Sequence, residues 1–131
     1  WKDFEIQAST SVIITDDVRA ALARIKPNVA LYVGGMGHKN INFHNQMMVR
    51  RGYADAAARI QELYLAGRKT EAADAVPDEF VDDGALVGPP ARIRERFKEW
   101  TQIPVTGLTI NGEAPGTLEL MADVAGLRGQ A

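Results

Sequence analysis

Apolar residues recur along the chain at two different spacings, and these predict short strands separated by helices. Strands are expected near residues 4–15, 85–87 and 105–110, where apolar and β-branched side chains form short runs. Between the first two, residues 16–80 carry apolar side chains at helical intervals, which indicates a long helical insert. Pro27 is expected to break or kink the first helix of that insert. Because strands and helices alternate, we expect parallel pairing.

Several helices are defined by their predicted buried faces. Asn42 is a plausible N-cap for a helix from Phe43 to Arg51. The later helices are expected to turn three sets of residues inward: Ile60, Leu63 and Tyr64; Ile93, Phe97 and Trp100; and Leu118, Met121, Ala122 and Ala125.

Three parallel strands are too few to make a complete α/β protein. Parallel sheets are normally covered on both faces, and a closed (β/α)8 barrel needs eight strands. We therefore expect this chain to be one part of a larger α/β protein, with residues 1–131 acting as a single C-terminal fragment. Strands 4–15 and 105–110 are expected to be open edges of the sheet, which favours pairing with another chain.

The composition is that of an ordinary globular protein and excludes several classes of function. The 131 residues are 46% hydrophobic and have a formal net charge of -2, so nothing favours binding to nucleic acid or to an anionic membrane. No apolar run approaches the roughly 20 residues of a membrane-spanning helix. The absence of cysteine excludes disulfides and fits a cytoplasmic protein.

The glycine-rich segment from Leu31 to Phe43 is the main candidate for binding. Glycines allow the backbone to approach a ligand closely, Lys39 is a point charge for a phosphate or carboxylate, and the asparagines can form hydrogen bonds. Residues 29–33 are expected to resume the helix after Pro27, and the simpler interpretation of the glycines is that they end that helix and reverse the chain. The functional alternative is a loop that covers a ligand. The candidate residues are Gly34, Gly35, Met36, Gly37, Lys39, Asn40 and Asn42.

Other polar groups are weaker candidates. Arg92 and Arg94 follow the second strand near a helix start, where an anionic group can bind, although a solvated helix face is the simpler interpretation. The acidic residues between Asp78 and Asp83 are expected to form a solvated connection. His38 and His44 do not have the spacing of a metal motif, so no metal site is predicted and the catalytic residues stay unknown.

Several strings of residues together resemble one family. They are Leu-Tyr-Val-Gly-Gly-Met-Gly at 31–37, Ile-Gln-Glu-Leu-Tyr-Leu-Ala-Gly-Arg at 60–68 and Leu-Val-Gly-Pro-Pro-Ala-Arg-Ile-Arg at 86–94. They resemble the C-terminal region of luciferase-like flavin and deazaflavin oxidoreductases, particularly the branch that uses coenzyme F420. The resemblance implies the C-terminal part of a TIM-barrel-like fold, an incomplete barrel in which the three strands are about the sixth, seventh and eighth.

The same resemblance implies a function for a longer parent protein. Members of the family transfer hydride between a small organic substrate and F420, or FMN as the alternative, and the latter would make this a segment of a monooxygenase. Most of the cofactor cradle and the acid–base residues lie in the first five strands, so the isolated chain is expected to be inactive. Its expected partner is the missing N-terminal half of the barrel or a second copy of itself. A non-catalytic α/β interaction module is the remaining alternative.

Overall fold

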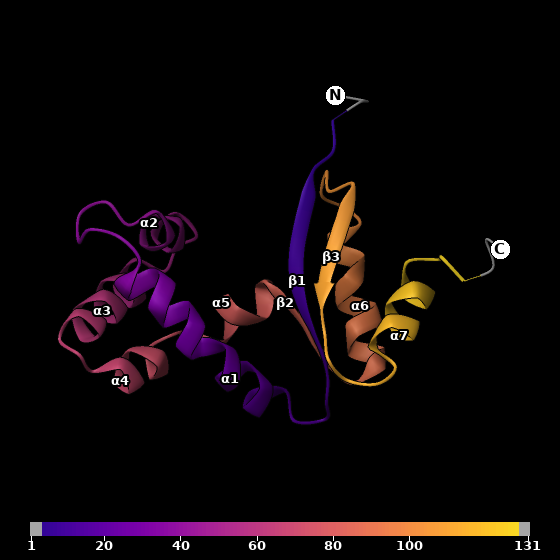
Figure 1. Ribbon diagram of the computed structural model, residues 1–131, viewed down its shortest axis with the longest axis horizontal. Helices are drawn as coiled ribbons and strands as arrows, with labels where there is room; N and C mark the ends of the chain where they lie inside the picture. Colours follow the sequence, from indigo (N-terminus) through magenta and orange to yellow (C-terminus); the bar gives the residue numbers. More distant parts are fainter. Residues whose placement is uncertain (1–3, 129–131) are drawn as a thin grey trace. The chain divides into compact units, whose positions relative to one another are not determined.

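The computed structural model describes residues 4–128, and the chain divides into two compact units (Figure 1). One unit, here called the sheet unit, is formed by Trp1–Ala21 together with Gly84–Ala131. The other, here called the helical unit, is Leu22–Asp83. The long insert between the first two strands is therefore a compact unit of its own.

The sheet unit contains three parallel strands, which confirms the expected α/β class and the open sheet. They are β1 (Gln7–Ile14), β2 (Ala85–Gly88) and β3 (Gly107–Asn111), in the order β2-β1-β3. The C-terminal half of β1 pairs with β2, and its N-terminal half pairs with β3. Ser11 has a partner on both sides, Ala85 in β2 and Asn111 in β3.

The expectation that the first strand forms an open edge is wrong, because β1 is the central strand. β1 has eight residues, so the four-residue β2 and the five-residue β3 can pair along its opposite sides in largely separate stretches. Consecutive strands of a barrel would instead place β2 in the middle. Within residues 4–128 the edges of the sheet are β2 and β3.

Two helices pack on one face of this sheet. α6 (Pro90–Trp100) follows β2, and α7 (Thr117–Val124) follows β3 (Figure 1). The predicted inner face of α6 is confirmed, since Ile93 is fully buried and Phe97 and Trp100 pack against the same core. The buried core residues are Val12, Leu86, Ile93, Leu120 and Met121.

The predicted inner face of α7 is only partly correct. Leu118 is 71% exposed, whereas Thr117, Leu120 and Met121 are buried. Positions 117, 120 and 121 are three and four residues apart, so they share the face that turns toward the sheet, and Leu118 falls outside that face. Ala125 follows the helix and is exposed.

The opposite face of the sheet is polar where β1 pairs with β3, whereas Ile13, Ala85 and Val87 make it apolar where β1 pairs with β2. Side chains alternate between the two faces of a strand, and the burial of β1 follows that alternation. Gln7 and Ser9 of β1 and Thr109 and Asn111 of β3 are exposed. The Asn111 Nδ2 atom donates to Ser9 Oγ at 3.1 Å across the two strands.

The helical unit begins within a long helix that ends in a π-helix. α1 (Val18–Ala30) starts after Asp17, whose Oδ1 accepts a hydrogen bond from Ala20 N at 3.0 Å. The expected break at Pro27 is absent, because both Pro27 and Ala23, whose carbonyl loses its helical donor, are exposed and water can hydrate that carbonyl. The π-helix η1 (Leu31–Gly35) follows directly.

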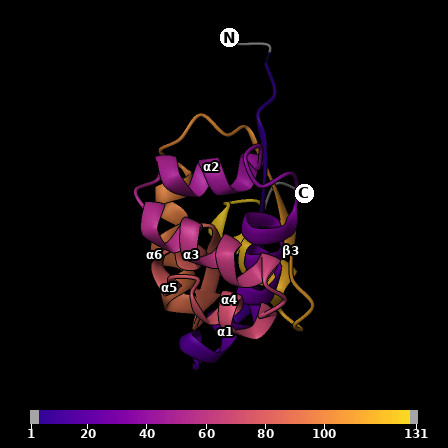
Figure 2. The ribbon, with the colours of Figure 1, turned by 90° about the vertical axis from the view of Figure 1, so that its left-hand side faces the viewer.

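Four more helices complete this unit. They are α2 (Phe43–Arg50), α3 (Ala54–Leu65), α4 (Lys69–Asp74) and α5 (Asp78–Asp83). α3 lies between α2 and α4 (Figure 2) and also packs against η1. Ile60 and Leu63 are buried as predicted, and Tyr64 is half-buried. No helix within residues 4–128 has both the length and the apolar character needed to cross a bilayer.

The acidic segment at 78–83 is a helix and not an irregular connection, although its acidic side chains are exposed or half-exposed as expected. Phe80 and Val81 of α5 are buried, and burial of these two side chains is the reason that the segment folds. Asp78 pairs with Lys26 of α1 at 2.5 Å, and Asp83 pairs with Arg51 at 3.0 Å. The Arg51 guanidinium also lies 4.5 Å from the centroid of the Phe80 ring.

Candidate functional site

The glycine-rich segment is partly helix and partly loop, and the helix extends two residues beyond the predicted range of 29–33. Leu31–Gly35 continues the first helix as η1, and the loop begins only at Met36 and ends at Asn42, before α2. π-helical turns are rare and are found at functional sites more often than elsewhere. Gly37 is the one glycine of this segment with a left-handed backbone, at φ +117°.

Gly34 and Gly35 are required for the packing of α3 against η1. A Cβ added to Gly34 would lie 2.5 Å from Tyr64 Cβ and 3.2 Å from the Ile60 carbonyl oxygen. At Gly35 the added atom would overlap the Tyr64 ring. Neither glycine has a left-handed backbone, so closeness to Tyr64 and not backbone freedom accounts for them. A structural role is therefore established for both, and a role in cofactor binding stays a prediction.

Two asparagine amides hold the end of η1. Asn42 is buried, and its Nδ2 atom donates to the carbonyls of Tyr32 (3.0 Å) and Val33 (2.9 Å). The Asn45 Nδ2 atom donates to Val33 O at 3.2 Å and to Ala57 O at 2.9 Å. The last carbonyls of a helix have no partners within it, and these amides satisfy them.

Asn42 is also the N-cap of α2, which confirms the prediction. Its Oδ1 atom accepts a hydrogen bond from Asn45 N at 3.0 Å. The Asn42 amide is thus committed to the fold and does not point into solvent. Sequence reasoning missed Asn45, although an Asn three residues after an N-cap has the spacing of a capping box.

The tip of the loop is exposed. His38 and Ile41 form an isolated bridge in which Ile41 N donates to His38 O at 2.8 Å. Ile41 is 75% exposed, and Met36, Lys39 and Asn40 are exposed as well. The tip of the loop therefore exposes both apolar and polar side chains, and the side chains of Asn42 and Asn45 hold the two ends of the loop in place.

Aromatic rings adjoin this tip, and sequence reasoning did not identify them as a group. The His44 ring lies edge-on to Tyr32 at 4.8 Å and to Phe43 at 5.5 Å between centroids. The Arg50 guanidinium carbon is 5.8 Å from the centroid of the Phe43 ring, which is itself exposed. Tyr32 comes from η1 and the other three residues from α2, and the exposed Phe43 ring is the face of this group on which a planar ligand can stack.

The charge of the surrounding segment is positive. Residues 22–54 include five Lys or Arg and no Asp or Glu, although the whole chain has a formal charge of -2. Lys26 and Arg51 are paired with Asp78 and Asp83 of α5. Within residues 4–128 no ion pair is formed by Lys39, so it is the cation of the loop tip that can meet an anionic group.

Arg92 and Arg94 belong to the sheet unit, and the two side chains do not converge. The Arg92 guanidinium donates to the Val87 carbonyl at the end of β2. Arg94 pairs with Asp123 of α7 at 2.6 Å. Side chains two residues apart on a helix are rotated by about 200° around the helix axis, so they point to nearly opposite sides. The two arginines therefore do not form one anion-binding site together. A contact with an anionic group stays a prediction for each of them separately.

Of the nine candidate residues, Met36, Gly37, Lys39 and Asn40 lie together at the exposed loop tip, whereas Gly34, Gly35 and Asn42 belong to its packed base. Among residues 4–128 no group of three or more His, Cys, Asp and Glu side chains is placed to hold a metal ion. The available groups are the Lys39 cation, the Asn40 amide, the backbone next to Gly37 and aromatic rings. This set can bind an anionic or planar ligand.

Comparison with known proteins finds a matching family and a relative that aligns with nearly the whole chain. A family model described as luciferase-like monooxygenase matches residues 2–107, which include all nine candidates. The chain is also 42% identical over 126 residues to a protein of Mycobacterium tuberculosis that is provisionally named a coenzyme F420-dependent oxidoreductase. That alignment covers 96% of this chain and 35% of the relative, so the chain spans about a third of the relative's length.

Proposed function

This chain belongs to the luciferase-like monooxygenase family, and we propose that it is the C-terminal segment of an oxidoreductase that uses coenzyme F420. The observation that supports this most strongly is the 42% identity over nearly the whole chain with the M. tuberculosis protein. The proposed reaction is hydride transfer between the deazaflavin and a small organic substrate, in the cytoplasm. The chain by itself is proposed to be inactive.

The proposed role of this segment is to hold the cofactor, and the groups at the loop tip are suited to that role. Lys39 is exposed and can neutralise a phosphate or carboxylate of the cofactor tail. Asn40, Met36 and the backbone at Gly37 lie on the same exposed loop and can add polar and apolar contacts. When bound, the deazaflavin supplies the hydride chemistry, while these residues orient the tail and neutralise its charge.

The base of the loop would supply rigidity. Asn42 and Asn45 fix the loop to the end of η1, and Tyr64 fixes η1 to α3. A loop held in this way loses little conformational entropy on binding, which favours affinity. Arg92 and Arg94 remain proposed contacts for an anionic group of the substrate in the longer protein.

FMN is the second candidate cofactor. The description of the matching family as a monooxygenase favours it, and FMN also carries an anionic phosphate that Lys39 can neutralise. The proposed partners are the remaining strands of a longer barrel or a second copy of this chain.

The test is a titration of the natural polypeptide that contains this sequence, with the 131-residue chain measured in parallel. Oxidised F420 and FMN are each added, and binding is followed by their fluorescence. We expect the natural polypeptide to bind F420 more tightly than FMN and the 131-residue chain to bind neither tightly. Tight binding of FMN without binding of F420 would reject the F420 assignment.

A further inference from the structure

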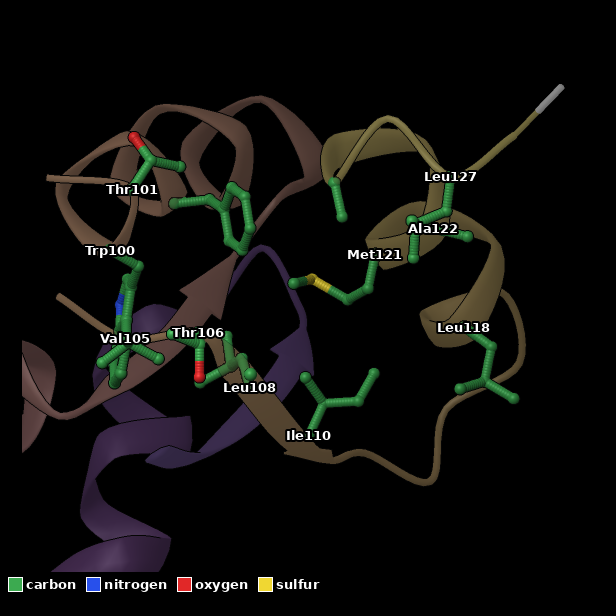
Figure 3. Close-up of a pocket in the computed structure, with 13 residues that line it drawn as sticks. Trp100, Thr101, Val105, Thr106, Leu108, Ile110, Leu118, Met121, Ala122 and Leu127 are labelled. Atoms are coloured by element: carbon green, nitrogen blue, oxygen red, sulfur yellow. The ribbon is translucent and has the colours of Figure 1, made fainter. Parts of the chain in front are cut away.

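The sulfur atoms of this chain belong to four methionines, because the sequence contains no cysteine. Met48 is fully buried, and Met121 is 6% exposed and lies among the apolar side chains between β3 and α7 (Figure 3). Met47 is half-buried, whereas Met36 is 47% exposed. A reagent in solution that attacks thioethers therefore has its best access to Met36.

The residues next to Met36 do not screen its thioether. Met36 follows Gly34 and Gly35 and precedes Gly37, so its neighbours in sequence have no side chains that could cover it. It also lies where the chain leaves η1, with an extended backbone at φ −90° and ψ 92°. The exposure of Met36 therefore follows from the local sequence and from the point at which the helix ends.

An exposed thioether of this kind reacts with peroxides. The O–O bond of hydrogen peroxide breaks, one oxygen atom is transferred to the Met36 sulfur, and the other leaves as water. The sulfur is oxidised by two electrons to a sulfoxide, and the peroxide is reduced. Methionine sulfoxide reductases reverse the change, with two electrons from a thiol and loss of the oxygen as water. The sulfoxide is polar and chiral, unlike the apolar side chain that it replaces.

We propose that Met36 is a site of reversible oxidation by peroxides and that its sulfoxide weakens the binding of F420 to the loop tip. Met36 lies three residues before Lys39, on the same exposed loop. The sulfoxide replaces an apolar contact at the tip by a polar group that must lose water when the ligand covers it. The effect on binding rests on the proposed function, whereas the site of oxidation rests only on the access to the thioether.

The first test uses the natural polypeptide that contains this sequence, so that the rest of the longer protein is present. It is treated with hydrogen peroxide for increasing times, and mass spectrometry of its peptides measures the oxygen gained by each of the four methionines. We expect Met36 to be oxidised about tenfold or more faster than Met48 and Met121, and faster than Met47. Oxidation of Met36 as slow as that of Met48 would show that the longer protein covers it and would overturn the proposal.

The second test measures F420 binding by the same polypeptide before peroxide treatment, after it, and after incubation with methionine sulfoxide reductases. We expect the treatment to raise the dissociation constant by about threefold or more and the reductases to restore it. Met36→Leu keeps an apolar side chain but has no sulfur at this position, so its dissociation constant should be the same before and after treatment. The matched control is Met47→Leu, because Met47 is a half-buried methionine of α2, and this variant should respond to peroxide as the unaltered protein does.

The outcomes separate this inference from the proposed function. An equal loss of binding in Met36→Leu and in the unaltered protein would overturn the effect assigned to Met36. Absence of F420 binding by the untreated polypeptide would overturn the proposed function and, with it, the effect of the sulfoxide on binding. The peptide measurement would in that case still establish or refute Met36 as the site of oxidation.

Discussion

Gly34 lies so close to Tyr64 that a Cβ at position 34 would be 2.5 Å from the Cβ of the tyrosine. This contact joins η1 to α3 and so fixes the start of the loop that carries Lys39. The glycine-rich segment owes two of its glycines to this contact. The binding loop is a short extension of a tightly packed helical base.

Alanine substitutions should show that the two glycines meet different parts of the tyrosine. The three atoms nearest to the added Cβ of Gly35→Ala all belong to the Tyr64 ring, so this variant should lower the free energy of unfolding by about 1–3 kcal/mol. A Tyr64→Ala background should remove most of that loss. The added Cβ of Gly34→Ala also meets Tyr64 Cβ and the Ile60 carbonyl, and both of these atoms remain in the Tyr64→Ala variant. The loss of stability caused by Gly34→Ala should therefore persist there. Urea unfolding of the two double-mutant cycles measures both terms. Equal rescue of both glycine variants would contradict the assigned contacts.

The two asparagines near the loop should differ sharply in their importance for stability. Asn42→Ala removes the N-cap of α2 and the buried donor to Tyr32 O, so it should cost about 2–3 kcal/mol. Asn40→Ala is the control, because Asn40 is exposed, and its change should stay within about 0.5 kcal/mol. Chemical denaturation gives both values. Comparable losses would mean that the Asn42 amide does not anchor the loop.

Acidification should weaken one surface ion pair at the start of α4. The hydrogen bond from Arg68 lowers the pKa of the Glu71 carboxyl below its ordinary value of 4.5, with Arg68 Nε at 2.6 Å from Oε1. The contribution of this pair to stability is therefore present above pH 4.5 and is lost as the pH falls through the lowered pKa. The pair is exposed, so the effect is small and weakens with salt.

A comparison with Glu71→Gln isolates this contribution. The difference in melting temperature between the two proteins should be greatest near neutral pH in low salt and should shrink toward zero as the pH is lowered below 4.5. A difference that grows on acidification would have the wrong sign for a lowered carboxyl pKa.

Local patterns predicted much of the fold. The β2 strand, the buried positions Ile60 and Leu63 of α3, and the cap at Asn42 each depend on residues close together in sequence. The same holds for α6, where Ile93 and Phe97 are spaced for one helix face. These features follow from propensity and periodicity, which a single sequence contains.

The errors concern contacts between distant residues. The glycines of η1 were expected to end the helix because nothing near them in sequence reveals Tyr64. α5 was missed because its helix depends on the burial of Phe80 and on ion pairs to Lys26 and Arg51. The central position of β1 depends on which strands pair, and periodicity does not determine pairing.

The most direct test of the proposed function is the effect of Lys39→Ala on F420 binding by the natural polypeptide that contains this sequence. Lys69→Ala is the matched control, because it removes a lysine of the same unit that lies outside the loop, at the start of α4. The Lys69 ammonium is 5.6 Å from the centroid of the Tyr64 ring. We predict that Lys39→Ala raises the dissociation constant for F420 by about tenfold or more, as expected for loss of a charge-assisted contact, and that Lys69→Ala leaves it unchanged. Equal dissociation constants for the Lys39→Ala variant and the unaltered protein would contradict a role for this loop in holding the cofactor.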